Sequence, residues 1–166
     1  MTLAAEQLER LRLLSDDLER IEDEDHFWSI LKAIQTSEEM FYVPWLLNWG
    51  DSWTEKAIKW VLDSNLCDAG TALAIYWLAC PTDWAGQEID ESGDDWDNNW
   101  IAFFRTLERR MRSLEFPSQV IAYDPKVDWK HWNADGSERH DLSGIPECMK
   151  RSSPGTKIKS LRELNL

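Results

Sequence analysis

The chain has 166 residues, of which 31 are acidic and 18 basic, so its formal net charge is −13, and 11 residues are Trp. A chain of this length forms one domain as a rule and can bury a core without disulfides or a metal. The charge argues against nucleic acid or an anionic membrane as a partner, because both are bound chiefly through Lys and Arg. A hydrophobic content of 43% excludes a disordered acidic tail.

The negative charge is concentrated in the N-terminal part. Residues 1–97 hold 22 acidic and 6 basic side chains, a net charge of −16, whereas residues 98–166 hold 9 acidic and 12 basic, a net charge of +3. A field of this kind steers a cationic ligand toward the acidic part. We therefore expect a basic partner.

The sequence favours a cytoplasmic location. Its start lacks the apolar run of a secretory signal peptide, and it has no apolar stretch long enough to span a membrane. The three cysteines, Cys67, Cys80 and Cys148, are widely spaced. Such spacing suits reduced thiols better than a disulfide framework.

Periodic apolar residues predict a series of helices in chain order. Leucines at spacings of three or four predict a helix over residues 4–22, and a second helix is expected over 26–36. Ser37 resembles a helix start, but Pro44 follows, so we expect Val43 and Pro44 to open a short helix that ends near residue 48. Thr54 is expected to cap the next helix, which ends near residue 65.

The run from Ala69 to Cys80 contains no charged residue. With Asp68 as N-cap and Pro81 as a stop, it predicts a helix over 68–80 that is apolar on every face, as expected at the centre of a core. An amphipathic helix over 95–115 follows, with an arginine face that we expect to pair with acidic neighbours such as Glu108. A short strand near 119–123 and a last helical turn near 160–164 complete the series.

These elements predict a mostly α, single-domain bundle of about six helices around the buried helix 68–80. We divide the chain into an N-terminal helix (4–22), a core of about 40–125 and an irregular C-terminal extension (126–166).

Site chemistry is sparse in the sequence. Zinc sites need closely spaced Cys and His, and no cysteine lies within seven residues of His26, His131 or His140. A calcium loop at 131–142 fails at its first and twelfth positions. The chain has no nucleophile elbow, phosphate loop or metalloprotease motif. We therefore expect no catalytic residue, metal or cofactor.

The segment 83–97 is the candidate partner-binding site. It contains seven carboxylates and no basic residue, and it carries two tryptophans in polar company. Exposed Trp is enriched at interface hot spots, and acids can steer a basic partner. The candidate residues are Asp83, Trp84, Glu88, Asp90, Glu91, Asp94, Asp95, Trp96 and Asp97. A metal-dependent enzyme that uses these carboxylates is a weaker alternative.

The middle of the chain also resembles a known family. The matching features are VPWLLN at 43–48, the motif CD-x-GTAL-x-IYW at 67–77, and IAYDP at 121–125. Over roughly residues 40–125 they are similar to a bacterial family of small acidic proteins, the domain of unknown function DUF 4274. The resemblance implies an immunity protein of a toxin system and carries over no catalytic residue. The motif residues from Cys67 to Trp77 fall in the central helix, so we expect them to be scaffold.

The leading hypothesis is a non-enzymatic acidic immunity protein that neutralises a cognate toxin domain, one that is basic and nuclease-like. The alternative is a regulatory adaptor for another basic protein.

Overall fold

The computed structural model describes residues 3–18, 24–47, 49, 52–84, 86–89, 95–116, 119–127, 137–138 and 140–166. For residues 16–18, 52–53, 95–97 and 127 only the backbone is described. No helix in these ranges is both long enough and apolar enough to cross a lipid bilayer.

The described part of the chain is mostly helical, as the sequence predicts. Its α-helices are α1 (Ala5–Leu18), α2 (Glu24–Lys32), α3 (Ser37–Leu46), α4 (Ser52–Asp63), α5 (Ala69–Leu78), α6 (Asp95–Arg112), α7 (Glu147–Lys150) and α8 (Leu161–Leu164). Two short strands, β1 (Ile121–Ala122) and β2 (Thr156–Lys157), and two 3-10 turns, η1 (Pro81–Asp83) and η2 (Pro125–Val127), complete it. Among the described residues, α1 to α6 are the long helices, in line with the expected bundle of about six.

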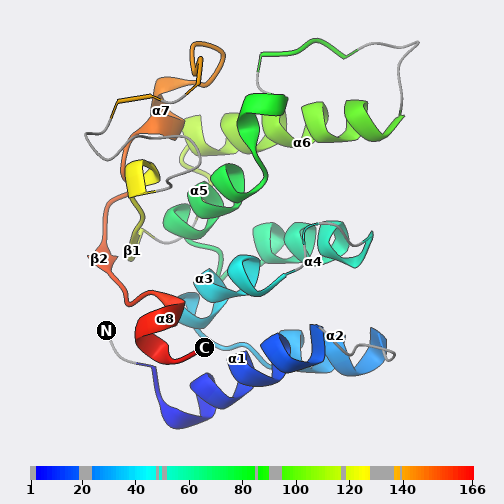
Figure 1. Cartoon of the computed structure of the whole chain (residues 1–166), viewed down its shortest axis with the longest axis vertical. Coiled ribbons are helices and arrows are strands. Elements are labelled where there is room, and N and C mark those ends of the chain that lie inside the picture. Colours follow the sequence, from blue (N-terminus) through cyan, green and yellow to red (C-terminus); the bar gives the residue numbers. More distant parts are fainter. Residues whose placement is uncertain are drawn as a thin grey trace.

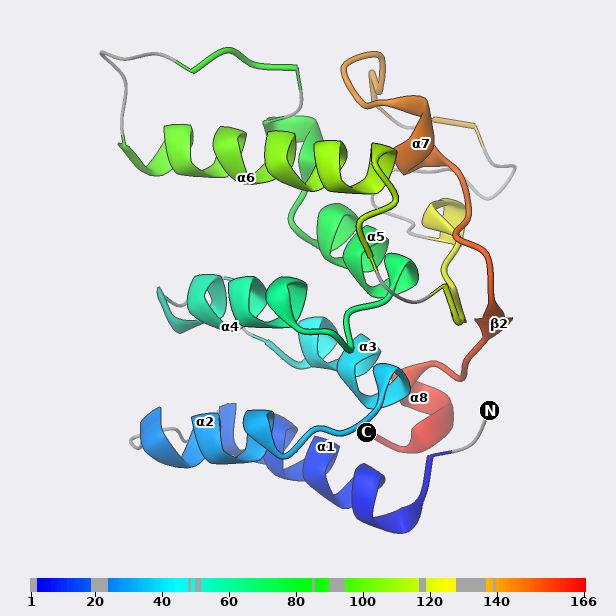
Figure 2. The same cartoon turned by 180° about the vertical axis from the view of Figure 1, so that it is seen from behind.

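The helices lie in a stack with α1 and α2 at one end and α6 at the other (Figure 1). Seen from behind, α5 lies between α6 and α3, while β1, β2 and α8 lie together along one side of the stack (Figure 2). The free ends of α2, α4 and α6 point to the opposite side in both views. The two sides therefore present different elements to solvent.

Helix α5 is the centre of the core, and the prediction for residues 68–80 is confirmed with slightly shorter bounds. Every residue from Ala69 to Trp77 is buried, and the side chains of Tyr76 and Trp77 are fully enclosed. The Asp68 carboxylate caps the helix by accepting a hydrogen bond from the Gly70 N–H at 2.6 Å. The chain leaves the helix through Cys80 in the left-handed conformation, directly before Pro81.

The expectation that Val43 and Pro44 open a helix is wrong. Helix α3 begins six residues earlier, at Ser37, where the Thr36 hydroxyl accepts a hydrogen bond from the Glu39 N–H. Pro44 lies near the end of α3, so it removes only a single hydrogen bond near the end of the helix. The buried run that precedes it, from Met40 to Val43, and the Thr36 cap outweigh that loss.

The other bounds agree with the sequence to within a few residues. Helix α1 covers most of the predicted 4–22, with residues 19–23 outside the described ranges, and α2 begins two residues earlier than predicted and ends at Lys32. Helix α6 ends at Arg112, and Leu114 then adopts a positive φ of 53°. The predicted last turn near 160–164 is α8, which begins with a capping box between Ser160 and Glu163.

The C-terminal residues share the core with α5. Strand β2 pairs in parallel with β1, in the register Ile121 to Thr156. The Trp77 indole N–H donates to the Met149 carbonyl at 2.8 Å inside the core. The buried Ser153 hydroxyl donates to the Ile121 carbonyl and accepts from the Tyr123 N–H. These bonds attach the segment that we predicted to be irregular to the central helix and to β1.

Candidate partner-binding groove

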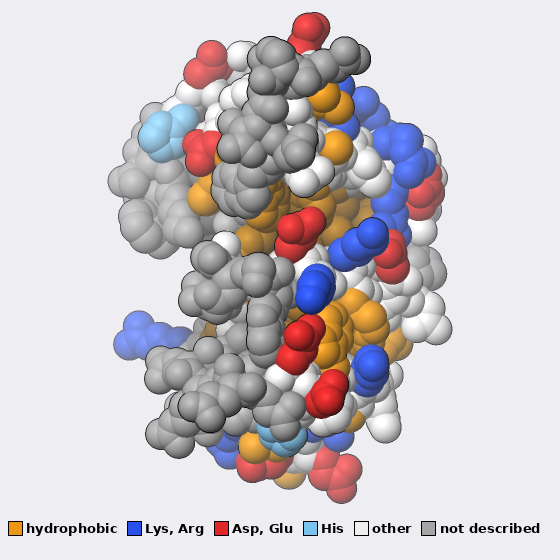
Figure 3. Space-filling view, turned by 90° about the vertical axis from the view of Figure 1, so that its right-hand side faces the viewer, with side chains coloured by type: hydrophobic (Ala, Val, Ile, Leu, Met, Phe, Trp, Pro, Cys, Tyr) orange, Lys and Arg blue, Asp and Glu red, His pale blue; other side chains and the backbone are white. Residues whose placement is uncertain are grey.

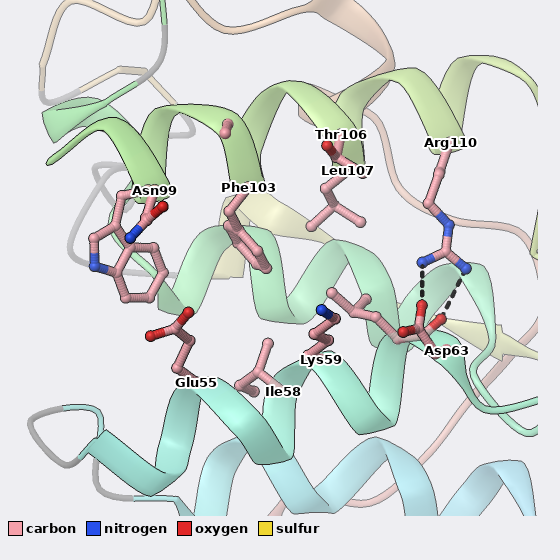
Figure 4. A pocket seen from close by; sticks show the side chains of 12 residues that line it. Glu55, Ile58, Lys59, Asp63, Asn99, Phe103, Thr106, Leu107 and Arg110 are labelled. Carbon is pink, nitrogen blue, oxygen red and sulfur yellow. Dashed lines mark hydrogen bonds and ion pairs between the residues drawn. The ribbon is translucent and has the colours of Figure 1, made fainter. Parts of the chain in front are cut away.

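An apolar groove lies between α4 and α6, with a volume of about 340 Å³. Ile58 and Leu62 on α4 and Leu107 on α6 are buried at its floor. The aromatic rings of Trp100 and Phe103 on α6 also line it and are only half-buried. Phe103 and Leu107 point from α6 toward α4 and Ile58 (Figure 4). The groove thus offers apolar and aromatic surface that a partner can contact.

Two stripes on α6, offset by one residue, explain how the sequence builds this groove. The core stripe contains Phe104 and Leu107, and the Phe104 ring packs edge-on against Tyr76 of α5 at a centroid distance of 5.1 Å. The second stripe lines the groove and consists of Asn99, Phe103, Thr106 and Arg110. Its spacing of three and four residues places these side chains on one face of the helix. On α4, residues 55, 58, 59, 62 and 63 form the facing stripe by the same spacing.

Charged side chains of both signs surround the groove. Arg110 closes one end, because its guanidinium donates to the Leu62 carbonyl at 2.8 Å and pairs with Asp63 at 3.4 Å (Figure 4). Glu55 and Asn99 stand at the other end. The side of the molecule that carries the free ends of α2, α4 and α6 shows hydrophobic side chains recessed between acidic and basic ones (Figure 3). Arg110 therefore links α6 to α4 at one end of the groove, and polar side chains border the groove at the Asn99 end.

The arginine face of α6 pairs with acceptors of the protein itself, as the sequence predicts. Arg105 donates to the Gln87 carbonyl at 2.8 Å, and Arg109 forms an ion pair with Glu115. Arg112 lies 3.9 Å from Glu108, the expected pair one helical turn apart. These contacts indicate a structural role for the arginines.

The structure describes the acid-rich segment only in part. Asp83 and Glu88 are exposed, and Trp84 is half-buried and packs against the core. Asp95, Trp96 and Asp97 form the first turn of α6, where only their backbone is described, and the next turn supplies Asn99 and Trp100 to the groove. The remaining predicted residues, Asp90, Glu91 and Asp94, lie outside the described residues.

The groove itself is lined by two aromatic residues of α6 that are not among the predicted site residues, Trp100 and Phe103. The helical spacing of Trp100 with Phe104 and Leu107 predicts a core position for Trp100, whereas the structure leaves its ring half-buried in the groove. Phe103 lies one position before Phe104 of the core stripe, and an aromatic residue in such a place is the sequence feature that indicates a second apolar face on α6. Acidic groups in the first turn of α6 also favour the helix electrostatically.

Buried titratable groups lie between α5 and α6. The Tyr76 hydroxyl donates to a Glu108 carboxylate oxygen at 2.8 Å. Burial is the main cause that raises the pKa of Glu108 above its usual range, against the opposing effect of this hydrogen bond. Burial likewise raises the pKa of Tyr76 well above its ordinary value. The pair joins α5 to α6, and this contact fits a scaffold role for the motif at 67–77.

The thiols and carboxylates of the described ranges make no metal site. No group of three or more His, Cys, Asp or Glu side chains in these ranges is arranged to hold an ion. All three cysteines are free thiols, and burial raises the pKa of Cys67 to about 12. His131 and most of the segment 131–142, which the sequence excludes as a calcium loop, lie outside the described residues.

Comparison with known proteins finds a family match over the helical centre of the chain. No curated protein and no solved structure matches the sequence. Residues 43–112 run from the last turn of α3 to the end of α6, so they include the motif at 67–77 and both walls of the groove. This segment matches the sequence model of a family described as a domain of unknown function, DUF4274.

Proposed function

We propose that the protein is a non-enzymatic binding protein, an immunity protein that neutralises a basic toxin domain by docking it on the α4–α6 groove. The observation that carries this proposal is the open apolar groove between α4 and α6, which is lined by the half-buried rings of Trp100 and Phe103. Trp100 follows the acid-rich segment 83–97 closely in the sequence. The walls of the groove lie within the matched family segment. A cytoplasmic location fits the three free thiols, which a reducing compartment preserves.

The groove supplies affinity and the acids supply speed in this proposal. Half-buried aromatic rings such as Trp100 and Phe103 are the residue types that dominate interface energies when a partner covers them. An inserted apolar side chain of the partner would displace water from the half-buried rings of Trp100 and Phe103, which gives roughly 25 cal/mol for each Å² of apolar surface buried. Long-range attraction between the acidic segment and a basic partner raises the association rate.

A regulatory adaptor for another basic protein would use the same groove and the same charges. The two functions differ in the consequence of binding, because only an immunity protein abolishes the toxicity of its partner.

The test has two stages. The full chain is used to capture its partner from the native cell, and the partner is eluted with salt and identified. That partner is then expressed alone and together with the chain in a growth assay. The immunity function predicts growth arrest by the partner alone and recovery on co-expression. A captured partner that does not impair growth would instead favour the adaptor, and a partner that remains toxic beside a stoichiometric amount of this chain would contradict immunity.

A further inference from the structure

A second, larger concavity lies on the other side of the molecule from the groove, where α3, the two strands and α8 meet. Its volume is about 700 Å³, within the roughly 300–1,000 Å³ of small-molecule sites. Figures 1 and 2 show β2 and α8 on the side away from the free ends of α4 and α6. The site is therefore separate from the proposed partner surface.

Three aromatic rings form one wall of this cavity. The Trp45 ring lies 6.3 Å from Phe41 and 6.2 Å from Tyr123, measured between ring centroids. Phe41 and Tyr123 are buried, whereas Trp45 is 36% exposed. The buried rings fix the position of Trp45 and leave part of its surface open to the cavity. A wall of this kind suits a planar group that stacks on the indole.

Basic residues stand at the edge of the same cavity. Lys157 in β2, Lys159 and Arg162 are exposed and line it, and none of them forms an ion pair with another described residue. They belong to the C-terminal part of the chain, whose net charge is +3. The cavity therefore combines a planar stacking surface with cations that are available to an anion.

The two carboxylates at this edge are engaged in their own turns. Glu163 accepts hydrogen bonds from the N–H and the hydroxyl of Ser160, each at 2.8 Å, in the capping box of α8. These bonds lower the pKa of Glu163, and the nearby charges of Lys157 and Lys159 lower it further, so it remains charged. Asp124 accepts a bond from the Lys126 N–H at 3.1 Å. The edge consequently has three cations against two anions that already have donors.

From this arrangement we propose that the cavity binds a nucleoside monophosphate, with the base against Trp45 and the phosphate at Lys157, Lys159 and Arg162. Bases stack on aromatic side chains whatever their hydrogen-bonding pattern, and Lys and Arg are the side chains that bind phosphate. A nucleic-acid strand is disfavoured because the net charge of −13 repels a run of phosphates. This proposal does not depend on the function proposed for the α4–α6 groove.

The test is isothermal titration calorimetry of the full chain with each common ribonucleoside 5′-monophosphate. Adenosine without phosphate and inorganic phosphate without a base are titrated separately. The proposal predicts one nucleotide per chain with a Kd below about 1 mM, and binding at least tenfold weaker for either half of the ligand.

Variants assign the binding to this cavity. Trp45→Leu removes the stacking surface, and the triple variant K157A/K159A/R162A removes the cations. R12A/K32A/K56A is the matched control, because it removes three exposed cations elsewhere with the same change in charge. Circular dichroism and the thermal midpoint show that each variant is folded.

We expect Trp45→Leu and the cavity triple variant each to weaken nucleotide binding at least tenfold and the control to bind as the wild type does. Absence of nucleotide binding would overturn the proposal. Equal binding of nucleotide and inorganic phosphate would overturn the stacking role of Trp45. Binding that survives both cavity changes would place the ligand elsewhere. Self-association of the chain that the cavity triple variant abolishes, without nucleotide binding, would identify an acidic protein segment as the occupant and would also overturn it.

Discussion

Replacement of Asp68 by Ala tests whether the charged residue of the motif at 67–77 is structural. The Asp68 side chain is fully buried, and its two oxygens accept hydrogen bonds from the Gly70 N–H at the start of α5 and from the Val120 N–H beside β1. Loss of the cap costs about 1 kcal/mol, and loss of the second bond, to a charged acceptor, costs about 1.5–3 kcal/mol. We expect Asp68→Ala to lower the free energy of unfolding by about 2–5 kcal/mol, which corresponds to a fall in Tm of about 4–20 °C for a domain of this size.

The assay is urea unfolding followed by far-UV circular dichroism, with Asp83→Ala as control because Asp83 is an exposed aspartate. Asp68→Asn should give an intermediate loss, since its amide oxygen can accept one of the two bonds while its NH₂ group opposes the other donor. A midpoint for Asp68→Ala equal to that of the control would refute the reasoning. Normal partner binding by the folded variant would in turn support the scaffold role of the motif.

Three further predictions concern packing, pH and charge. Gly70→Ala should destabilise the protein by roughly 1–3 kcal/mol, since a Cβ would lie 2.3 Å from the Ile121 carbonyl oxygen; a stability in urea equal to or above that of the wild type would contradict this. The raised pKa of Glu108 means that its contribution to stability is full below its unfolded pKa and falls as the pH rises through the folded pKa. Denaturation of Glu108→Gln between about pH 4 and pH 7 should therefore show the variant gaining stability relative to the wild type as the pH rises, and an opposite trend would exclude this role. Neutralising four acids of the segment 83–97 together should lower the association rate with the basic partner and flatten its salt dependence in stopped-flow measurements; unchanged association would show that this surface is not used. The four are Asp90, Glu91, Asp94 and Asp95.

The central helix and α6 were predictable because each is specified locally. A charge-free run between Asp68 and Pro81 leaves few alternatives to a buried helix, and the apolar spacing of α6 fits only a helical period. The predicted start of α3 was wrong because Pro44 removes only one hydrogen bond near the end of the helix. The Thr36 cap and the burial of the residues before Pro44 stabilise the helix by more than that loss.

Neither cavity could be derived from the sequence. The groove depends on the separation between α4 and α6 in space, and the spacing of residues within either helix does not determine that separation. The second cavity brings Trp45 of α3 beside Lys157 of β2, residues that are far apart along the chain. Trp84 has polar neighbours in sequence yet packs partly against the core, because burial is decided by tertiary contacts rather than by flanking residues.

The most direct test of the proposed function is the affinity of the captured basic partner for a groove variant. Thr106 is exposed on α6 and lines the groove, so Thr106→Arg obstructs it without disturbing the core. Ser113→Arg adds the same charge just beyond α6 and outside the groove. Surface plasmon resonance should show a Kd at least tenfold higher for Thr106→Arg than for Ser113→Arg, a difference of about 1.4 kcal/mol or more. Equal affinities for the two variants would contradict docking on the α4–α6 groove.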